Sequence, residues 1–299
     1  MLHFLPGFIL APINILLFIV NTVWWGGLVC LLALPKLLLP YQPWRNAVTT
    51  LMERCVDGWT LVNLGILRLS NQVQWDVQGL DGLKKDGWYL IMANHLSGLD
   101  IIVLFTIARG RMPLPRFFIK HELLHVPFMG WGCWALDMPF MRRYSTGYLK
   151  RHPEKKGQDI ETTRRACEKL RHRPTTMINF VEGTRFTPEK QKKRRSPYRH
   201  LLPPKAGGIA FTLATMGQLF DKVLDVTLAY PECGHGKGKV TWAALSGRLT
   251  KVVVRIDAQP ADQRVIGDYF GDVTFKRQFQ GWLSERWQRK DALLGELNK

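Results

Sequence analysis

Residues 88–100 read Trp-Tyr-Leu-Ile-Met-Ala-Asn-His-Leu-Ser-Gly-Leu-Asp, an apolar run that ends at two polar residues, Asn94 and His95. A short apolar run of this length predicts a buried β-strand. From Asp100 to position 108 the chain is again apolar and has the length of a helix. The stretch therefore predicts a strand, a polar loop and a helix, with His95 at the carboxyl end of the strand.

The same arrangement recurs further along the chain. Residues 176–181 predict a second buried strand, which ends at Glu182-Gly183-Thr184-Arg185. Additional strands are predicted at 72–77, 117–120, 138–141, 223–230, 241–244 and 251–256. Helices are predicted at 47–70, 100–108, 161–171, 206–216 and 273–297, with a turn and helix at 127–134. Strands that alternate with helices predict an α/β sandwich with its motif loops at strand ends.

The two amphipathic or basic segments outside this core each allow two interpretations. The apolar stripe of the helix at 273–297 packs on the sheet or, alternatively, lies at a membrane interface. The run of lysines and arginines at 190–195 is a solvated, mobile loop or a contact for lipid headgroups or an acidic acyl donor.

The N-terminal segment carries no charged side chain from Phe4 to Pro35. It is longer than the roughly 20 apolar residues that one membrane crossing needs. The missing basic start and the long apolar part argue against a secretory signal peptide. Pro12 and the string at 24–27 interrupt the segment and leave two alternatives. One is a single spanning helix over about residues 13–34, and the other is a bent helical hairpin that dips into one leaflet.

The charge balance predicts anionic partners. The 299 residues carry a formal net charge of +18, which favours phospholipid headgroups or an acidic carrier. Neither a Cys/His zinc pattern nor an aromatic RNA-binding string is present, so no nucleic acid is expected. The five cysteines are widely spaced without metal-ligand spacing, which predicts no metal site and a reduced compartment. Since nearly all charge follows Lys36, the positive-inside rule places the main domain on the cytoplasmic side.

His95 and Asp100 are candidates for acid–base chemistry. If Asp100 lies in the first turn of the following helix, its carboxylate reaches the His95 imidazole and fixes its tautomer. The other ring nitrogen is then able to take a hydroxyl proton. Ser97 and Asp100 also fit a helix capping box, which explains both residues without catalysis.

The residues after the second strand are suited to a phosphate. Gly183 allows close approach of the backbone, Thr184 offers a hydroxyl, and Arg185 offers a bidentate fork. Two further sets of cations follow predicted strands or open helices: the pair Arg142-Arg143, and Lys205 before Ala206-Gly207-Gly208.

Together these motifs resemble those of the 1-acyl-sn-glycerol-3-phosphate (lysophosphatidate) acyltransferase family of glycerolipid acyltransferases. His95 and Asp100 match its Asn-His-x4-Asp block, and residues 180–185 match its Phe-x-Glu-Gly-Thr-Arg block. Residues 140–143 correspond to a Phe-x-x-Arg block and residues 226–231 to a later strand that ends in Pro. The order of blocks is kept over residues 70–235, although Ala229-Tyr230 replaces the more usual aliphatic pair before Pro231.

The resemblance implies a mixed sheet flanked by helices, with His95 as general base and Asp100 as the residue that orients it. It implies an acceptor glycerol phosphate bound by Arg143 or Arg142, Glu182, Gly183, Thr184 and Arg185. The expected organisation is a membrane anchor at 1–40, a membrane-proximal amphipathic helix at 41–70 and a catalytic domain at 71–299.

The expected function is transfer of a fatty acyl group to the sn-2 hydroxyl of a lysophospholipid, above all lysophosphatidic acid. The donor is acyl-CoA or acyl carrier protein, and no permanently bound cofactor is expected. The continuation after Arg185 resembles a subgroup that includes lysocardiolipin acyltransferases, so lysophosphatidylglycerol and lysocardiolipin remain alternative acceptors. A non-catalytic, membrane-anchored module for anionic lipid or a carrier is a second alternative, and a hydrolase is a third. Eukaryotic relatives often add later hydrophobic spans, which favours a bacterial inner membrane here.

Overall fold

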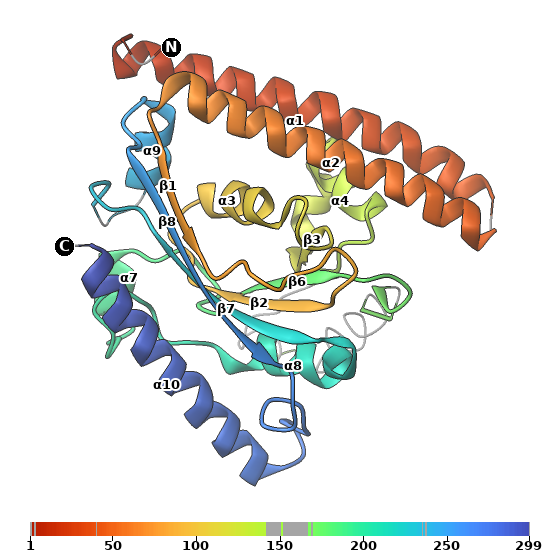
Figure 1. The fold of residues 1–299 in the computed structure, drawn as a ribbon, viewed down its shortest axis with the longest axis vertical. Coiled ribbons are helices and arrows are strands. Elements are labelled where there is room, and N and C mark those ends of the chain that lie inside the picture. The colour runs from red at the N-terminus through yellow and green to blue at the C-terminus, as the bar shows by residue number, and fades with distance from the viewer. Residues whose placement is uncertain are drawn as a thin grey trace.

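The computed structural model of the chain describes residues 2, 4–39, 41–141, 151, 167, 168, 170–234, 236 and 238–298 (Figure 1). The strands are β1 (Gln74–Gln78), β2 (Tyr89–Ala93), β3 (Pro115–Phe117), β4 (Ile119–Lys120), β5 (Phe140–Met141), β6 (Thr176–Phe180), β7 (Lys222–Ala229) and β8 (Lys251–Pro260). The α-helices are α1 (Gly7–Leu38), α2 (Gln42–Ser70), α3 (Leu99–Ala108), α4 (Met129–Ala135), α7 (Pro188–Lys193), α8 (Ala206–Met216), α9 (Lys239–Leu245) and α10 (Val273–Leu297), and short 3₁₀ helices cover His121–His125 and Gly217–Leu219.

A six-stranded mixed sheet forms the centre, in the order β1-β8-β7-β2-β6-β3. β7, β2, β6 and β3 run parallel to one another, whereas β8 pairs with β7 in the antiparallel sense. β4 and β5 form a separate parallel pair. The α/β class and the mixed sheet flanked by helices are as predicted.

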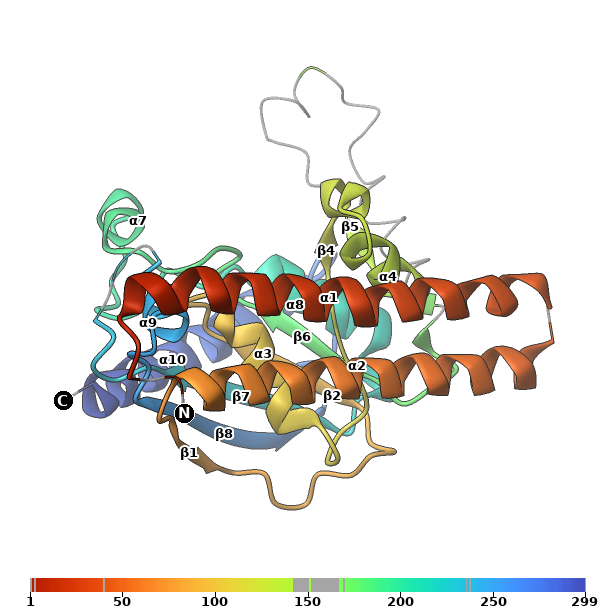
Figure 2. The same ribbon diagram turned by 90° about the horizontal axis from the view of Figure 1, so that it is seen from above.

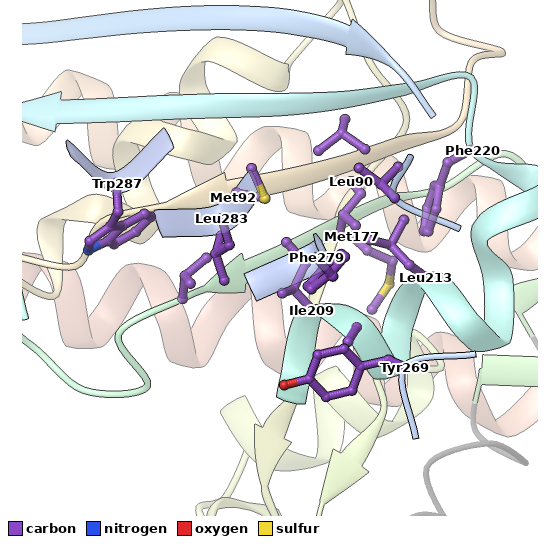
Figure 3. Close-up of a cluster of buried hydrophobic side chains, with 14 of the residues drawn as sticks. Leu90, Met92, Met177, Ile209, Leu213, Phe220, Tyr269, Phe279, Leu283 and Trp287 are labelled. Atoms are coloured by element: carbon purple, nitrogen blue, oxygen red, sulfur yellow. The ribbon is translucent and has the colours of Figure 1, made fainter. Parts of the chain in front are cut away.

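Alternate residues of the central strands enter two separate cores. In β2, Leu90 and Met92 face α8 and α10, whereas Tyr89, Ile91 and Ala93 face α3. All five β2 side chains are buried, as expected for a central strand covered on both faces. Figure 3 shows the first core, in which Phe279, Leu283 and Trp287 of α10 pack on the sheet and on α8. The packing interpretation of the last helix is therefore confirmed.

The helices α1 and α2 lie side by side as a long antiparallel pair on the α3 side of the sheet (Figures 1 and 2). α1 is one continuous helix over 32 residues, with Pro12 and Pro35 inside it. A bent hairpin within this segment is therefore wrong, because the chain turns only after Leu38. The amphipathic helix expected at 41–70 corresponds to α2.

Two other predictions of local structure are wrong. The strand expected at 241–244 is part of α9, which buries Val240, Ala243 and Ala244 at helical spacing. The loop interpretation of 190–195 also fails for residues 190–193, because Pro188 at the first helical position and the Thr187 cap begin the helix α7 there. The basic helix predicted at 161–171 lies largely outside the described residues, as do Arg142 and Arg143.

Candidate active site

The carboxyl ends of three neighbouring strands meet at one edge of the sheet, because β7, β2 and β6 are parallel. Polar residues follow each strand at this edge. Asn94 and His95 follow β2, Glu182 and Gly183 lie just beyond β6, and Tyr230 follows β7. Open edges of this kind are where α/β proteins place ligands.

His95 and Asp100 are in direct contact. The carboxylate Oδ2 of Asp100 lies 2.7 Å from Nδ1 of the His95 ring. Asp100 is in the first turn of α3 and is fully buried, and the His95 ring stacks on Phe180 with 4.0 Å between centroids. The prediction that the chain folds back to join the two residues is confirmed.

The same carboxylate also organises the start of α3. Asp100 Oδ2 accepts hydrogen bonds from the backbone amides of Leu96 at 2.7 Å and Ser97 at 3.0 Å, while Ser97 Oγ accepts from the Leu99 amide. Gly98, not Ser97, directly precedes the helix, and no side chain caps it, so the capping box is incomplete. The contacts of Asp100 with the loop amides and with His95 occur together. The helix start holds the carboxylate still, and the carboxylate holds the imidazole.

This pairing decides which nitrogen of His95 is available. An ionised Asp100 favours the tautomer in which Nδ1 carries the proton and donates it to the carboxylate. Nε2 is then left with a lone pair, on a side chain that is 14% exposed. The arrangement suits a general base that takes a proton from a hydroxyl group.

Backbone contacts fix the position of the loop that carries His95. The buried Asn94 side chain extends the pairing of β2 with β7, donating to the Leu228 carbonyl at 2.9 Å and accepting from the Leu228 amide at 2.8 Å. The His95 carbonyl accepts from the Phe186 amide at 2.7 Å. The loop after β2 is thus joined to the strand β7 and to the segment after β6.

Glu182 points into the protein. Its side chain is fully buried, and its two oxygens accept from the backbone amides of His95 at 3.0 Å and Leu202 at 2.9 Å. Burial raises the pKa of Glu182 to about 7, against the two amide hydrogen bonds and the Lys290 ammonium, which favour the charged form. Both oxygens are engaged, so this placement fits support of the His95 backbone better than direct contact with an acceptor.

The residues after Glu182 form an exposed cationic corner. Gly183 has a φ of +66°, and a Cβ there would come within 3.2 Å of the Lys205 side chain, so a glycine suits both the turn and the contact. The Thr184 hydroxyl and the Arg185 carbonyl accept from the Lys190 ammonium at 2.8 and 2.9 Å. The Arg185 side chain is exposed.

Three other residues join this site. Lys205 directly precedes α8, and its backbone amide bonds to the Val181 carbonyl at 2.8 Å. Lys190 and Arg194 of the basic run contact the corner, Arg194 through the Glu182 carbonyl at 3.4 Å. Lys205 was a predicted site residue, whereas the only signal for Lys190 and Arg194 in the sequence was the density of positive charge.

Tyr230 is the residue that the sequence reasoning failed to place. Its hydroxyl donates to Oδ1 of Asp100 at 2.8 Å. The only signal available was the departure from an aliphatic pair before Pro231. The sequence does not show which residue a tyrosine at a strand end contacts, because its partner Asp100 lies 130 residues away in the chain.

Comparison with known proteins places this site in a family. The model of the Acyltransferase family matches residues 74–230, a range that includes His95, Asp100 and the corner at 182–185. The match covers more than half of the chain, and the protein therefore belongs to the acyltransferase family.

Individual relatives are more distant. Lysocardiolipin acyltransferase 1 of Gallus gallus is 22% identical over 264 residues, which are 84% of this chain and 64% of that protein. The 1-acyl-sn-glycerol-3-phosphate acyltransferase delta of Mus musculus is 27% identical over 219 residues, covering 69% of this chain and 52% of the relative. The chain thus spans about half to two thirds of these relatives.

The fold also has a solved counterpart. The crystal structure of the 1-acyl-sn-glycerophosphate (LPA) acyltransferase PlsC from Thermotoga maritima superposes with a TM-score of 0.58 at 20% sequence identity. The similarity covers 94% of this chain and 93% of that one. At this identity the likeness establishes the shared fold.

Proposed function

We propose that the protein is a membrane-associated acyltransferase that moves a fatty acyl group from a thioester to the sn-2 hydroxyl of a lysophospholipid. The preferred acceptor is lysophosphatidic acid, and the donor is acyl-CoA or acyl carrier protein. The observation that carries the proposal is the His95–Asp100 pair, joined at 2.7 Å, beside the cationic corner at Gly183–Arg185.

The reaction needs a base for an alcohol and a site for a phosphate. Nε2 of His95 takes the proton of the acceptor hydroxyl, and the hydroxyl oxygen attacks the thioester carbonyl carbon. The tetrahedral intermediate collapses with cleavage of the C–S bond. The sulfur then receives the proton from the imidazolium and leaves as a thiol, which restores neutral His95. Asp100 stabilises the imidazolium while it exists.

The named relatives and the charge of the corner support the choice of acceptor. By their names, one of the two relatives acts on 1-acyl-sn-glycerol-3-phosphate and the other on lysocardiolipin, and the protein of the solved structure acts on 1-acyl-sn-glycerophosphate. A phosphate monoester is the most highly charged headgroup among these candidates, and Arg185 offers it an exposed guanidinium.

The test is acyl transfer from labelled acyl-CoA by the detergent-purified full chain. Lysophosphatidic acid, lysophosphatidylglycerol and lysocardiolipin serve as acceptors. We expect product with the wild type, most rapidly with lysophosphatidic acid. Labelled free fatty acid without any acceptor dependence would instead indicate a hydrolase. If acyl-CoA gives no product, the assay is repeated with acyl carrier protein as donor. Absence of product with both donors would reject the proposal.

Arg185→Ala is expected to raise the KM for lysophosphatidic acid by about 10- to 100-fold, because a charge-assisted contact contributes about 1.5–3 kcal/mol. The KM for acyl-CoA should change little. Lys193→Ala is the matched control, since it removes one exposed positive charge from the neighbouring α7. Equal rises for donor and acceptor would contradict a role of Arg185 in binding the acceptor phosphate.

We propose that the protein associates with the membrane through α1, which lies parallel to the bilayer surface and does not cross the bilayer. α1 has the length and apolar character of a crossing helix, with 32 residues. Its polar side chains, however, are engaged with the rest of the protein along its length. Asn14 donates to the Leu245 carbonyl at 2.8 Å, and Lys36 contacts Asp137 at 2.6 Å. A crossing helix would have to take these partners into the hydrocarbon with it.

The opposite face of α1 is apolar and exposed. It is formed by Phe8, Ile15, Leu16, Ile19, Val20, Val23, Trp24, Leu31, Leu34, Leu37 and Leu38. An apolar stripe on a helix whose other face is packed is suited to insertion into one leaflet. In this orientation the catalytic domain lies beside the bilayer that holds both lipid substrates.

Leu16→Lys/Val20→Lys is expected to release the protein from vesicles of 70% phosphatidylcholine and 30% phosphatidylglycerol, because it places two charges within the exposed stripe. Flotation on a density gradient measures the bound fraction. Gln278→Lys/Gln288→Lys adds the same charge at exposed positions of α10 and should leave binding intact. Unchanged flotation of the α1 variant would show that another surface anchors the protein.

A further inference from the structure

Both oxygens of the Asp100 carboxylate are engaged, and from different sides. Oδ2 accepts from Nδ1 of His95 and from the amides of Leu96 and Ser97, all within 3.0 Å. Oδ1 accepts from the hydroxyl of Tyr230 at 2.8 Å. The Tyr230 hydroxyl is thus the hydrogen-bond donor to the carboxylate oxygen that does not contact the imidazole.

Tyr230 is held rigidly enough to set the orientation of its partner. It is the first residue after β7 and is 4% exposed. Its ring belongs to the core on the α3 face of the sheet, together with Leu228 of β7 and Val240 of α9. The hydroxyl therefore reaches Asp100 from a fixed strand end, and the carboxylate cannot rotate without losing this bond.

The protonation of Tyr230 fixes the direction of its hydrogen bond with Asp100. Burial, and next the charge of Asp100, raise the pKa of Tyr230 well above its usual range, so the phenol keeps its proton. A neutral phenol beside an ionised carboxylate can only donate. The donated bond draws negative charge away from the imidazole side of the carboxylate.

We propose that Tyr230 is a positioning residue of the active site, whose hydroxyl holds Asp100 against His95. The catalytic meaning of this assignment rests on the proposed function. A carboxylate that is shared with a phenol stabilises the imidazolium less than an unshared one. Loss of the phenol hydroxyl should therefore strengthen the interaction of the carboxylate with the imidazolium.

Among the described residues, two ionisable groups are joined to this part of the sheet edge. Glu182 contacts the His95 amide from the end of β6, and Lys290 of α10 donates to the Met92 carbonyl of β2. Cys233, after β7, lies near the phenol, and burial raises the pKa of this thiol. Tyr230→Phe changes none of these groups, so its effect reports on the hydroxyl.

Two measurements on Tyr230→Phe test the proposal. The first is the pH dependence of kcat/KM for acyl transfer to lysophosphatidic acid. We expect the acidic limb to move to higher pH by about half a unit or more, since a hydrogen bond to a charged group is worth about 1.5–3 kcal/mol, part of which reaches His95. We also expect kcat to fall at every pH, because the carboxylate is less well oriented.

The second measurement does not depend on activity. Titration of the ring nitrogens by NMR, in ¹⁵N-histidine-labelled full-length protein, gives the pKa of His95, with His95→Ala to assign the signal. A rise in this pKa in Tyr230→Phe is the expected result. It is readable even if the protein transfers no acyl group, so failure of the proposed function and failure of this inference are distinguishable.

Tyr198→Phe is the matched control. Tyr198 is also buried and bonded, to Ser284, but lies in the core on the opposite face of the sheet. It should leave the His95 pKa and the acidic limb unchanged. The inference is overturned if Tyr230→Phe leaves both unchanged, if it moves them downward, or if Tyr198→Phe moves them equally.

Discussion

His95→Ala is expected to lower the rate of acyl transfer by about 10³-fold, within the range of about 10²–10⁴ that a positioned general base contributes. The physical reason is that the variant leaves the acceptor hydroxyl without a proton acceptor, while Asp100 and the cationic corner stay in place. The measurement is kcat with labelled acyl-CoA and saturating lysophosphatidic acid. Acceptor KM should change little, because His95 is expected to act on the hydroxyl and not on the phosphate.

The loss must be separated from damage to the fold. His95 contributes a partly exposed ring that stacks on Phe180, so the variant should unfold at nearly the same temperature as the wild type. His125→Ala removes an exposed imidazole from the 3₁₀ turn before α4 and should keep full activity. Acyl transfer by His95→Ala at more than a tenth of the wild-type rate would refute the assignment of His95 as base and favour a non-catalytic lipid-binding module.

The strands that carry the site were predictable because they are buried on both faces. β2 appears in the sequence as an uninterrupted apolar run and β6 as a largely apolar one that contains Asn179, and each is followed by a polar motif. Parallel pairing then brings the ends of the runs to one edge of the sheet. The contact between His95 and Asp100 was predictable for a different reason. Only five positions separate the residues, and a helix start fixes the geometry between them.

Short segments were not predictable in the same way. The apolar run at 241–244 has the length of a strand and also the spacing of a single helical turn, and nothing local decides between them. The position of this segment beside α1 and α3 favours the helix, because Val240 and Ala244 then face a helical layer. Likewise, the basic run at 190–195 carries a proline and a cap just before it, but its positive charge suggested a loop.

Contacts between distant segments depend on the order of the strands, which the sequence does not state. Tyr230 meets Asp100, and Lys290 of α10 meets Asp225, only because β7 lies beside β2 and α10 crosses both on one face. In the sequence, Lys290 is one of many cations in a basic helix. Only the structure distinguishes this buried ammonium from the exposed ones around it.

Lys290 is the most deeply buried cation of α10. Its Nζ lies 2.6 Å from Oδ1 of Asp225 and donates to the carbonyls of Val226 at 2.5 Å and Met92 at 3.1 Å. Burial lowers the pKa of Lys290, but the Asp225 carboxylate and then Glu182 counter this by favouring the charged form. The ammonium therefore joins α10 to two strands directly beneath the loop that carries His95.

Lys290→Met is expected to destabilise the protein by about 3–5 kcal/mol, the usual effect of removing one partner of a buried ion pair. Methionine keeps most of the side-chain volume, so the loss arises from the Asp225 charge left without its partner and from the two lost hydrogen bonds to carbonyls. The free energy of unfolding comes from urea titration in detergent. Arg286→Met, one turn earlier on α10, removes a pair with the exposed Asp257 and should change this energy by about 1 kcal/mol or less.

The double variant Asp225→Asn/Lys290→Met separates charge from packing. If the uncompensated carboxylate causes the loss, Lys290→Met should destabilise the Asp225→Asn protein by much less than it destabilises the wild type. An equal loss in both backgrounds would mean that the side chain acts through packing alone. Lys290 also favours the charged form of Glu182, which supports the His95 backbone. Lys290→Met should therefore lower kcat as well, because this support weakens.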